Sequence, residues 1–260
     1  MRQNKERIPS WALSVLALLA ALAVWWLLAA TGKLNPLFLP SPGKVWDAFA
    51  AIWQEGYKGS SLGRHLSDSL LRLAAAFGLA LATAVPIGLL SGHYRWLRAL
   101  LYPFVEFYRP LPPLAYYTML VLWFGIDNLS KILLLYLAAF APLYIAVVSG
   151  VARVPEDRLL AARSLGAGKV QLFFRVILPS CLPEIFIGLR TSIGIMYTTL
   201  VAAEMVAAVS GIGWMVLDAS KFLRSDIVLA GIILMGLIAL CIDVFLQLAQ
   251  KRAVPWNGKE

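Results

Sequence analysis

Residues 158–179 read RLLAARSLGAGKVQLFFRVILP, and this stretch differs from the sequence on either side of it. The chain has 260 residues, of which 60% are hydrophobic and only 14% are charged. Five basic residues nevertheless gather in and just before this stretch: Arg153, Arg158, Arg163, Lys169 and Arg175. We interpret it as a basic insert that lies outside the bilayer between two apolar segments.

The basic insert carries the signals of two short helices. Pro155 suits the first position of a helix, the acidic residues at 156 and 157 suit its first turn, and Gly166 suits its end. A second helix is predicted from about 168 to 175, ending before Pro179. Two helices joined at a glycine would project as a knob. A face of small side chains on this knob could fit a groove on another protein: Ala161, Ala162 and Ser164.

The apolar segments around the insert predict an all-α integral membrane protein. A hydrocarbon core about 30 Å thick requires roughly 20 apolar residues per helix, and residues 11–30 meet this without a charge. Five further runs are predicted to span: 68–90, 103–124, 131–150, 183–205 and 227–249. The sequence therefore predicts six transmembrane helices in a single membrane domain over 1–260.

A cleaved signal peptide is the alternative for the first run, because Arg2, Lys5 and Arg7 precede it. The run is long for a signal peptide, however, and Trp25 and Trp26 suit an interfacial anchor better than a cleavage site. We therefore treat this run as a membrane helix that stays in the protein.

The distribution of Lys and Arg between the loops predicts the orientation. One side of the membrane would hold thirteen of them, in residues 1–10, the 91–100 loop, the insert 151–179 and the tail, and the other side would hold seven. Since the more basic side is cytoplasmic, both termini and the insert are predicted to be cytoplasmic. The formal net charge of +9 then reflects topology and contact with anionic lipid, and not nucleic-acid binding.

Two segments are predicted on the outer side. Residues 41–56 begin with Ser41 as a plausible N-cap and place apolar residues on one face, which predicts a short interfacial helix. The same pattern could be a docking surface for an external partner. Residues 206–226 form a second outer loop, in which Gly211 and Gly213 permit a tight turn.

The chain lacks the motifs of an enzyme or a nucleotide-binding protein. It has no H-E-x-x-H, no G-x-S-x-G and only two His, so catalytic, metal and cofactor sites are not expected. The GAGK of the insert is not a phosphate-binding loop, because Arg163 replaces the first Gly of that motif and Val170 replaces its Ser or Thr. We expect that the chain does not bind ATP itself.

Ionisable residues inside the predicted spans are candidates for a translocation path. Arg190, Tyr197 and Glu204 recur every seven residues and share one helix face, with Thr191 and Thr198 beside them. They could line a polar pore, or Arg190 and Glu204 could each pair with a neighbouring span and hold the bundle together.

Glu106 and Arg109 in the third span are three residues apart and can pair on one helix. Three prolines follow at 110, 112 and 113 and would break that helix. A structural salt bridge at a bend is the favoured role for the pair, and a gate is the alternative.

The insert also resembles the EAA loop of bacterial ABC-importer permeases. The shared pattern is xAAxxxG followed nine residues later by V-x-L-P, here Leu160, Ala161, Ala162, Gly166, Val176, Leu178 and Pro179. The family has Glu at the position of Leu160 and usually Ile at that of Val176. By this resemblance the following residues couple the chain to an ATPase: Pro155, Leu160, Ala161, Ala162, Ser164, Leu165, Gly166, Ala167, Gly168 and Pro179.

The resemblance extends over nearly the whole chain. It includes PLFLPSP (36–42), EFYRPLPPLA (106–115), WFGIDNLSKILL (123–134), RTSIGIMYTTLVAAEMVAA (190–208) and VPWNG (254–258). These stretches are similar to permeases for taurine, alkanesulfonates and nitrate, and most of all to taurine permeases.

The resemblance implies a type I ABC importer permease in a bacterial plasma membrane. It implies a homodimer that works with two copies of a cytoplasmic ATPase, which bind ATP and Mg, and with an external solute-binding protein. The implied substrate is taurine, with aliphatic sulfonates, nitrate or a thiamin precursor as alternatives. A secondary transporter is a remote alternative, because such proteins usually show internal repeats that are not visible here.

Overall fold

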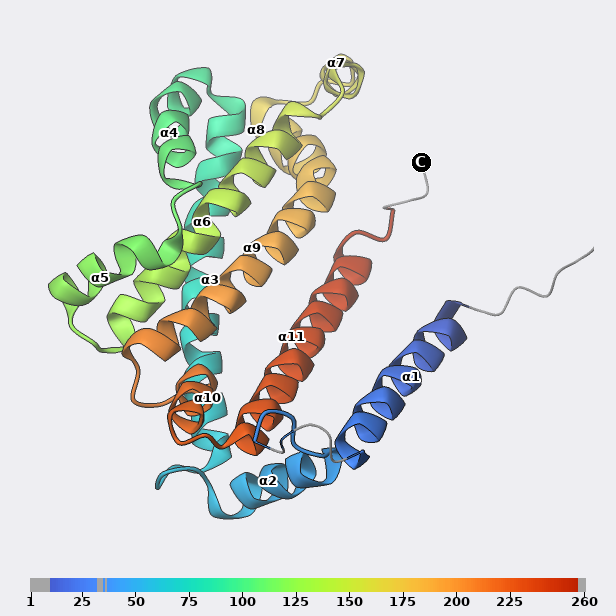
Figure 1. Ribbon diagram of the computed structural model, residues 1–260. Helices are drawn as coiled ribbons and strands as arrows, with labels where there is room; N and C mark the ends of the chain where they lie inside the picture. Colours follow the sequence, from blue (N-terminus) through green and yellow to red (C-terminus); the bar gives the residue numbers. More distant parts are fainter. Residues whose placement is uncertain (1–9, 32–34, 36, 257–260) are drawn as a thin grey trace, which may run out of the picture. The chain divides into compact units, whose positions relative to one another are not determined.

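The computed structural model describes residues 10–31, 35 and 37–256, and these residues are almost entirely helical (Figure 1). The predicted cytoplasmic segment 1–10 lies outside the described residues except for Ser10. The helices are α1 (Ser10–Ala30), α2 (Pro42–Glu55), α3 (Leu62–His93), α4 (Arg95–Tyr108), α5 (Pro113–Phe124), α6 (Asn128–Ala152), α7 (Glu156–Ser164), α8 (Lys169–Leu172), α9 (Leu178–Ala207), α10 (Ile212–Lys221) and α11 (Ser225–Ala253).

Five helical segments are long and apolar enough to cross a membrane. They are Ala12–Ala30, Leu62–His93, Asn128–Ala152, Lys169–Ala207 and Ser225–Ala253. These segments correspond to five of the six predicted spans, and the all-α prediction is confirmed. Because each backbone N–H and C=O inside a bilayer needs a partner, uninterrupted helices of this length are what the apolar runs require.

The remaining predicted span, 103–124, is not one helix. The chain leaves the helical path after Tyr108 and resumes it at Pro113, so the segment is divided between α4 and α5. The prolines at 110, 112 and 113 supply no backbone N–H, and each opposes a helical conformation in the residue before it. The prediction of a loop at 91–100 is also wrong, because α3 continues to His93 and α4 begins at Arg95.

The basic insert begins as predicted with a short helix, α7. This helix ends at Leu165 and Gly166, where Gly166 has a φ of +81°. The Gly166 N–H donates to Arg163 O at 2.9 Å, and the Ala167 N–H donates to Ala162 O at 3.1 Å. These two bonds make a Schellman ending, which requires the left-handed conformation that glycine adopts most easily.

The predicted stop before Pro179 is wrong. The chain continues from α8 through a π-helical turn, Phe173–Ile177, directly into α9. The Leu178 N–H donates to Phe173 O, five residues earlier. Pro179 has no N–H and lies at the start of α9, so the wider turn before it lets the helix pass the proline without a break. The second helix of the insert and the following span are therefore one helical segment, Lys169–Ala207.

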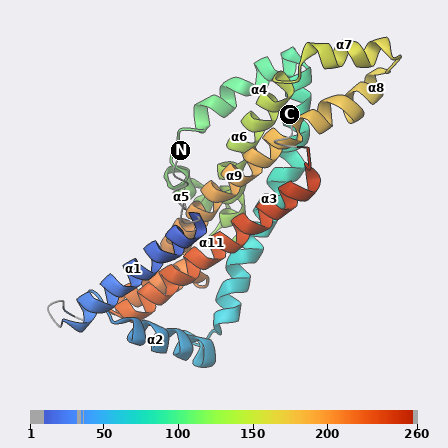
Figure 2. The same cartoon turned by 90° about the vertical axis from the view of Figure 1, so that its right-hand side faces the viewer.

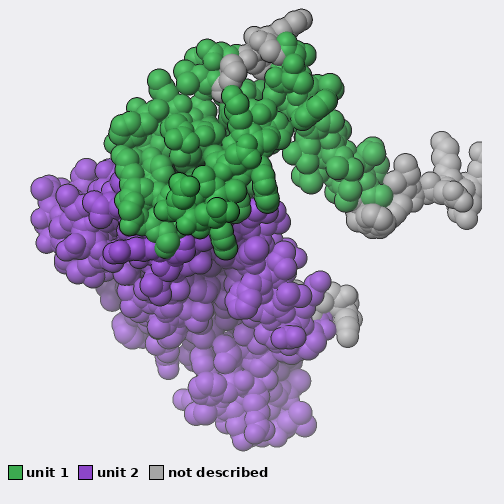
Figure 3. Space-filling model, turned by 90° about the horizontal axis from the view of Figure 1, so that it is seen from below, with its two compact units in different colours: residues 1–62, 215–233 green, residues 63–214, 234–260 purple. Residues whose placement is uncertain are grey.

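By internal contacts the chain divides into two compact units, which Figure 3 colours separately. The first contains residues 1–62 and 215–233, and the second contains residues 63–214 and 234–260. Each unit is described by itself below.

The core of the second unit lies where α6 packs against α9, and the two helices lie side by side in Figures 1 and 2. Leu143, Tyr144 and Met196 are fully buried there. A Cβ on Gly188 of α9 would lie 2.5 Å from the Cβ of Ala146 of α6. Glycine at this position therefore allows the two helices to approach closely.

In the first unit, α2 begins as predicted, with Ser41 as its N-cap and Pro42 in its first turn. The Ser41 hydroxyl accepts a hydrogen bond from Lys44 N at 3.4 Å. Val45, Ala48 and Ile52 are buried. Two tryptophans of this helix, Trp46 and Trp53, are exposed, as in helices that lie at a membrane surface.

Candidate functional site

A buried ion pair joins α3 to α9 in the second unit. Arg72 Nη1 lies 2.7 Å from Glu204 Oε1, and the two side chains are 6% and 1% exposed. The Ser69 hydroxyl donates to the same carboxylate oxygen at 2.7 Å. A charge buried in a membrane protein is stable only with such partners, so the pair fixes the two helices against each other.

The loop that follows α9 closes over this ion pair. Gly213 N donates to Glu204 Oε2 at 3.0 Å, and Arg72 Nη1 donates to Ser210 O at 2.9 Å. A Cβ on Gly211, which has a φ of +125°, would lie 2.4 Å from the Glu204 carboxyl group. Only glycine allows the backbone to come so close in this conformation.

A third helix joins the same group of side chains. Arg72 Nε donates to Asn128 Oδ1 at 2.7 Å, and Asn128 is the first residue of α6. We call Ser69, Arg72, Asn128, Glu204 and Ser210 the polar cluster. Since it connects α3, α6, α9 and the loop after α9, it fixes one end of the second unit.

These contacts correspond to the alternative that the sequence left open for Glu204, namely pairing with a neighbouring span. Arg190 is likewise paired, through two hydrogen bonds of 2.9 and 3.0 Å to Asp243 Oδ1 of α11. Tyr197 donates to Met235 O of the same helix at 2.8 Å. A role of this helix face in transport remains a prediction.

The hydroxyl groups beside that face bond within α9. Thr191 Oγ1 donates to Ile187 O at 3.0 Å, and Thr198 Oγ1 donates to Ile195 O at 2.9 Å. Such bonds let a threonine lie in a membrane helix without an unpaired hydroxyl. Thr191 in addition lines a cavity of the second unit.

This cavity has a volume of about 380 Å³ and lies between the α4–α5 connection, the first turn of α5, α6 and α9. Arg109 lines it, and Arg109 Nη1 also donates to Glu106 Oε1 at 3.3 Å. The predicted pairing of these two residues next to the proline break is therefore present. Both side chains are more than one third exposed, so the contact adds little stability.

Except for Pro179, which lies in the first turn of α9, the predicted coupling residues lie in the insert that contains α7 and α8. Leu160 is 56% exposed and Leu165 is 90% exposed. Ser164 Oγ donates to Leu160 O at 3.0 Å. Gly168 is the N-cap of α8, and its N–H donates to Gln171 Oε1 at 3.1 Å. Exposed leucines on a short polar helix favour contact with another protein.

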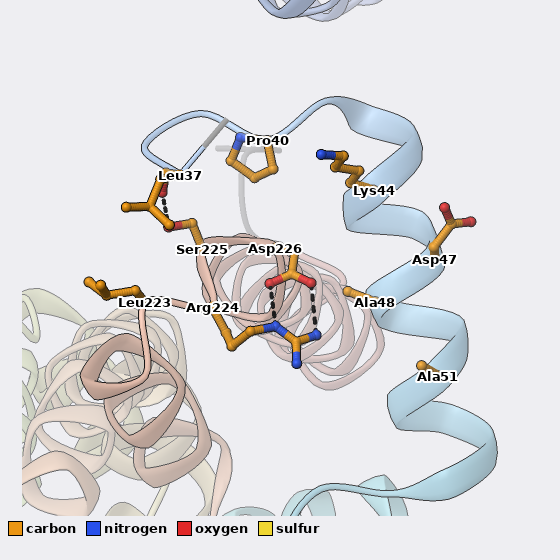
Figure 4. A pocket seen from close by; sticks show the side chains of 10 residues that line it. All are labelled: Leu37, Pro40, Lys44, Asp47, Ala48, Ala51, Leu223, Arg224, Ser225 and Asp226. Atoms are coloured by element: carbon orange, nitrogen blue, oxygen red, sulfur yellow. Dashed lines mark hydrogen bonds and ion pairs between the residues drawn. The ribbon is translucent and has the colours of Figure 1, made fainter. Parts of the chain in front are cut away.

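A second cavity, of about 470 Å³, lies within the first unit (Figure 4). It is lined by the α1–α2 connection, α2 and the α10–α11 connection, so the two predicted outer segments meet there. Arg224 and Asp226 pair at 2.9 Å, and Ser225 Oγ donates to Leu37 O. Lys44 extends over the cavity and Asp47 points away from it. Its described cations are thus one paired arginine and one lysine.

The α2–α3 loop is tied to α10 in the same unit. Asp218 Oδ2 accepts a hydrogen bond from Tyr57 Oη at 2.8 Å and lies 2.8 Å from Lys58 Nζ. The Lys58 ammonium also lies 4.1 Å from the ring centre of Phe222. Burial and the hydrogen bond to Asp218 raise the pKa of Tyr57 to about 12. These contacts order the loop between α2 and α3.

The sequence analysis missed Arg72 and Asp243. These residues pair with Glu204 and Arg190, the two charged residues of the fifth predicted span. Each lies inside a predicted span, at 68–90 and 227–249, and the rule that singled out Arg190 and Glu204 applies to them equally. A count of opposite charges within the spans would have identified both residues. It would not have indicated which acid pairs with which base.

Comparison with known proteins identifies the family. Residues 84–254 match the family of binding-protein-dependent transport system inner membrane components. The chain belongs to this family. It is therefore a non-catalytic, multi-pass inner membrane subunit, the permease of an ABC importer, as the sequence predicted.

Several relatives are similar over nearly the full length. The taurine transport system permease protein TauC of Escherichia coli strain K12 is 44% identical over 95% of this chain and 90% of its own. The putative aliphatic sulfonates transport permease protein SsuC of the same strain is 36% identical, over 96% and 92%. The nitrate import permease protein NrtB of a Synechocystis species is 30% identical, over 94% and 89%.

The fold is also found in a solved structure. A chain of the MetNI methionine ABC transporter in an inward-facing conformation matches with a TM-score of 0.61 and 17% identity. The match covers 75% of this chain and 94% of that chain. The predicted type I ABC importer permease fold is thereby confirmed.

Proposed function

We propose that this chain is the membrane subunit of an ATP-driven importer of taurine or a closely related small sulfonate. The observation that carries the proposal is the 44% identity with TauC over 95% of the chain. The lower identities with SsuC and NrtB favour taurine over longer alkanesulfonates and nitrate. Aliphatic sulfonates and nitrate are the alternative substrates, and a thiamin precursor is a further alternative.

The active assembly in this proposal contains two copies of the chain. Each copy has one basic insert, and an importer with two ATPase subunits needs two inserts. The ATPases bind ATP and Mg, and an external solute-binding protein delivers the sulfonate. The exposed Leu160 and Leu165 supply apolar contact area for the ATPase on the insert.

Continuity between α8, the second helix of the insert, and α9 supports the coupling mechanism. The helical segment runs without interruption from Lys169 to Ala207 and includes the π-helical turn. A displacement of the insert by the ATPase would move this segment as one body. The segment carries Arg190 and Glu204, which connect it to α11 and α3. Movement at the cytoplasmic end is thus transmitted to the opposite end of the bundle, giving alternating access.

The proposed orientation places both termini and the insert in the cytoplasm. It rests on the excess of Lys and Arg in those segments. The α2 helix and the α10–α11 connection then lie outside, where the solute-binding protein docks.

ATP hydrolysis in proteoliposomes tests the proposal. The purified chain is reconstituted with its candidate ATPase and a solute-binding protein loaded with taurine. We expect taurine-loaded protein to stimulate hydrolysis and the Gly166→Pro variant to abolish that stimulation. Proline requires a φ near −65°, which the Schellman ending at this position excludes.

The control is Gly78→Ala in α3, outside the insert. A Cβ added at Gly78 would meet nothing within 4 Å, so alanine fits without strain. Hydrolysis that responds only to another loaded protein would exclude taurine while retaining the importer. If the chain recruits no ATPase, the proposed coupling is wrong.

A further inference from the structure

We propose that the cavity between the α4–α5 connection, α6 and α9 is a binding site for a small sulfonate within the permease. The proposal rests on the proposed function, because it gives the same class of substrate a resting place inside the membrane subunit. Arg109 binds the anionic group, and apolar walls hold the short carbon chain.

Arg109 is the cation of this cavity. The one hydrogen bond of its side chain within the described residues is the 3.3 Å contact of Nη1 with Glu106, which is long for a charged pair. Its side chain is 51% exposed. The rest of the planar guanidinium is thus free to donate to two oxygens of a sulfonate, as guanidinium groups do with carboxylates and phosphates.

The first turn of α5 adds a second positive contribution. Pro113, the first residue of that helix, and Tyr116 both line the cavity. The N-cap residue, Pro112, offers no side-chain oxygen to satisfy the helix end. Because the N-terminus of a helix carries a partial positive charge, this end of α5 favours an anion in the cavity.

A tyrosine hydroxyl on the wall needs a partner. Tyr108 lines the cavity, and its Oη is buried without a hydrogen-bond partner among the residues that the structure describes. A buried hydroxyl without a hydrogen bond is unfavourable. The Oη is not open to the cavity in this structure, and a small rotation of the Tyr108 side chain would let it donate to an oxygen of a bound sulfonate.

A backbone acceptor lies on the α6 wall. Pro142 has no N–H, so the carbonyl of Ala138, four residues earlier, lacks its usual helical donor. Both residues line the cavity. A freed carbonyl of this kind accepts a hydrogen bond from the ammonium group of an amino sulfonate. The described lining contains no acidic side chain, so this carbonyl is the complement to the amine.

The remaining walls and the size fit a short carbon chain. Ala141, Ile187 and Ile195 are among the apolar residues that line the cavity. Its volume of about 380 Å³ lies within the range of roughly 300–1,000 Å³ for small-molecule sites. A lipid acyl chain would suit the apolar walls but would leave the Arg109 donors that do not contact Glu106 without an acceptor.

Equilibrium binding to the full chain in nanodiscs tests the proposal. The probe is radiolabelled taurine, with propanesulfonate and the uncharged propanesulfonamide as competitors. We expect saturable binding that propanesulfonate displaces and the sulfonamide does not. Arg109→Gln should weaken binding at least tenfold, and Thr191→Trp, which fills the cavity, should abolish it.

Arg95→Gln is the matched control, because Arg95 is an exposed cation at the other end of α4 and outside the cavity. It should bind as tightly as the wild type. Thermal unfolding of each variant verifies that it is folded. Equal binding by Arg109→Gln and Arg95→Gln, absence of saturable binding, or displacement by phosphatidylglycerol alone would overturn the proposal.

The reconstituted importer separates this inference from the proposed function. If taurine stimulates hydrolysis but binding to the permease does not depend on Arg109, the importer stands and the cavity site is wrong. If sulfonates bind through Arg109 but taurine-loaded protein does not stimulate hydrolysis, the site stands and the proposed substrate is wrong.

Discussion

Arg72 on α3 and Glu204 on α9 form an ion pair whose side chains are only 6% and 1% exposed. Arg153 and Glu184, which also form an ion pair in the second unit, have side chains that are 69% and 25% exposed. The same pair of residue types therefore occurs in two environments. Since a buried charge that loses its partner cannot be solvated, the two pairs should differ greatly in their contribution to stability.

Glu204→Gln should destabilise the protein strongly. Arg72 would keep its charge in a buried position without a counter-charge, which typically costs about 3–5 kcal/mol. Glu184→Gln changes the same residue type in the exposed pair and should cost no more than about 1 kcal/mol. Chemical unfolding of both variants in detergent measures the difference. Similar losses for the two would contradict the role given to the polar cluster.

Gly211→Ala should destabilise the loop that covers Glu204. The new Cβ would meet the Glu204 carboxyl group at 2.4 Å, in a left-handed conformation, and backbone strain alone is of order 1–3 kcal/mol. The control is Gly194→Ala in the middle of α9, where a Cβ meets nothing within 4 Å. Thermal unfolding should show a clear loss for the first variant and none for the second. An unchanged midpoint for Gly211→Ala would show that the loop does not depend on this approach.

The contact between the α2–α3 loop and α10 should weaken in acid. Partial burial favours the neutral carboxyl group of Asp218, but hydrogen bonds from Lys58 and Tyr57 outweigh it and lower the pKa of Asp218 below its ordinary value of 3.8. Because the folded protein then binds this proton less readily than the unfolded chain, the contact stabilises above that value and is lost as the pH falls below it.

Asp218→Asn should therefore lower the unfolding temperature at pH 7, and its difference from the wild type should shrink as the pH falls below 3.8. Unfolding temperatures measured from pH 7 to below 3.8 follow the effect. Asp47→Asn is the control, since Asp47 is exposed and points away from its neighbours in Figure 4. A difference for Asp218→Asn that stays constant with pH would rule out the carboxylate as its cause.

Reporter fusions test the proposed orientation. A fluorescent protein fused to the C-terminus should fold and fluoresce in the cytoplasm, whereas alkaline phosphatase at that position should be inactive. Alkaline phosphatase inserted after Lys58, in the α2–α3 loop, should be active. The opposite pattern at both positions would reverse the orientation inferred from the basic residues.

The sequence was most informative where a local pattern is also the physical cause of the structure. Apolar runs must become helices in a bilayer, so five long helices followed from composition. The ending of α7 followed from Gly166, because the left-handed conformation is a property of that residue. The resemblance to ABC-importer permeases, based on the insert, identified the family that the comparisons confirm.

The sequence was less informative where two influences oppose each other. Pro179 suggested the end of a helix, but the π-helical turn before it carries the chain into α9. The 103–124 run is long enough to span, but its prolines divide it into α4 and α5. In both cases the outcome depends on how the neighbouring turns adjust, and no single residue determines this.

Hydropathy and charge are enough to establish a helical membrane protein with a basic insert, because both act on each segment independently of its neighbours. The pairing of Glu204 with Arg72 and of Arg190 with Asp243, and the position of Arg109 on a cavity wall, instead follow from how the helices pack. A charge in a span requires a partner, but many arrangements of the helices could supply one. The packing of α3, α6, α9 and α11 selects among them, and that packing depends on close contacts such as Gly188 with Ala146.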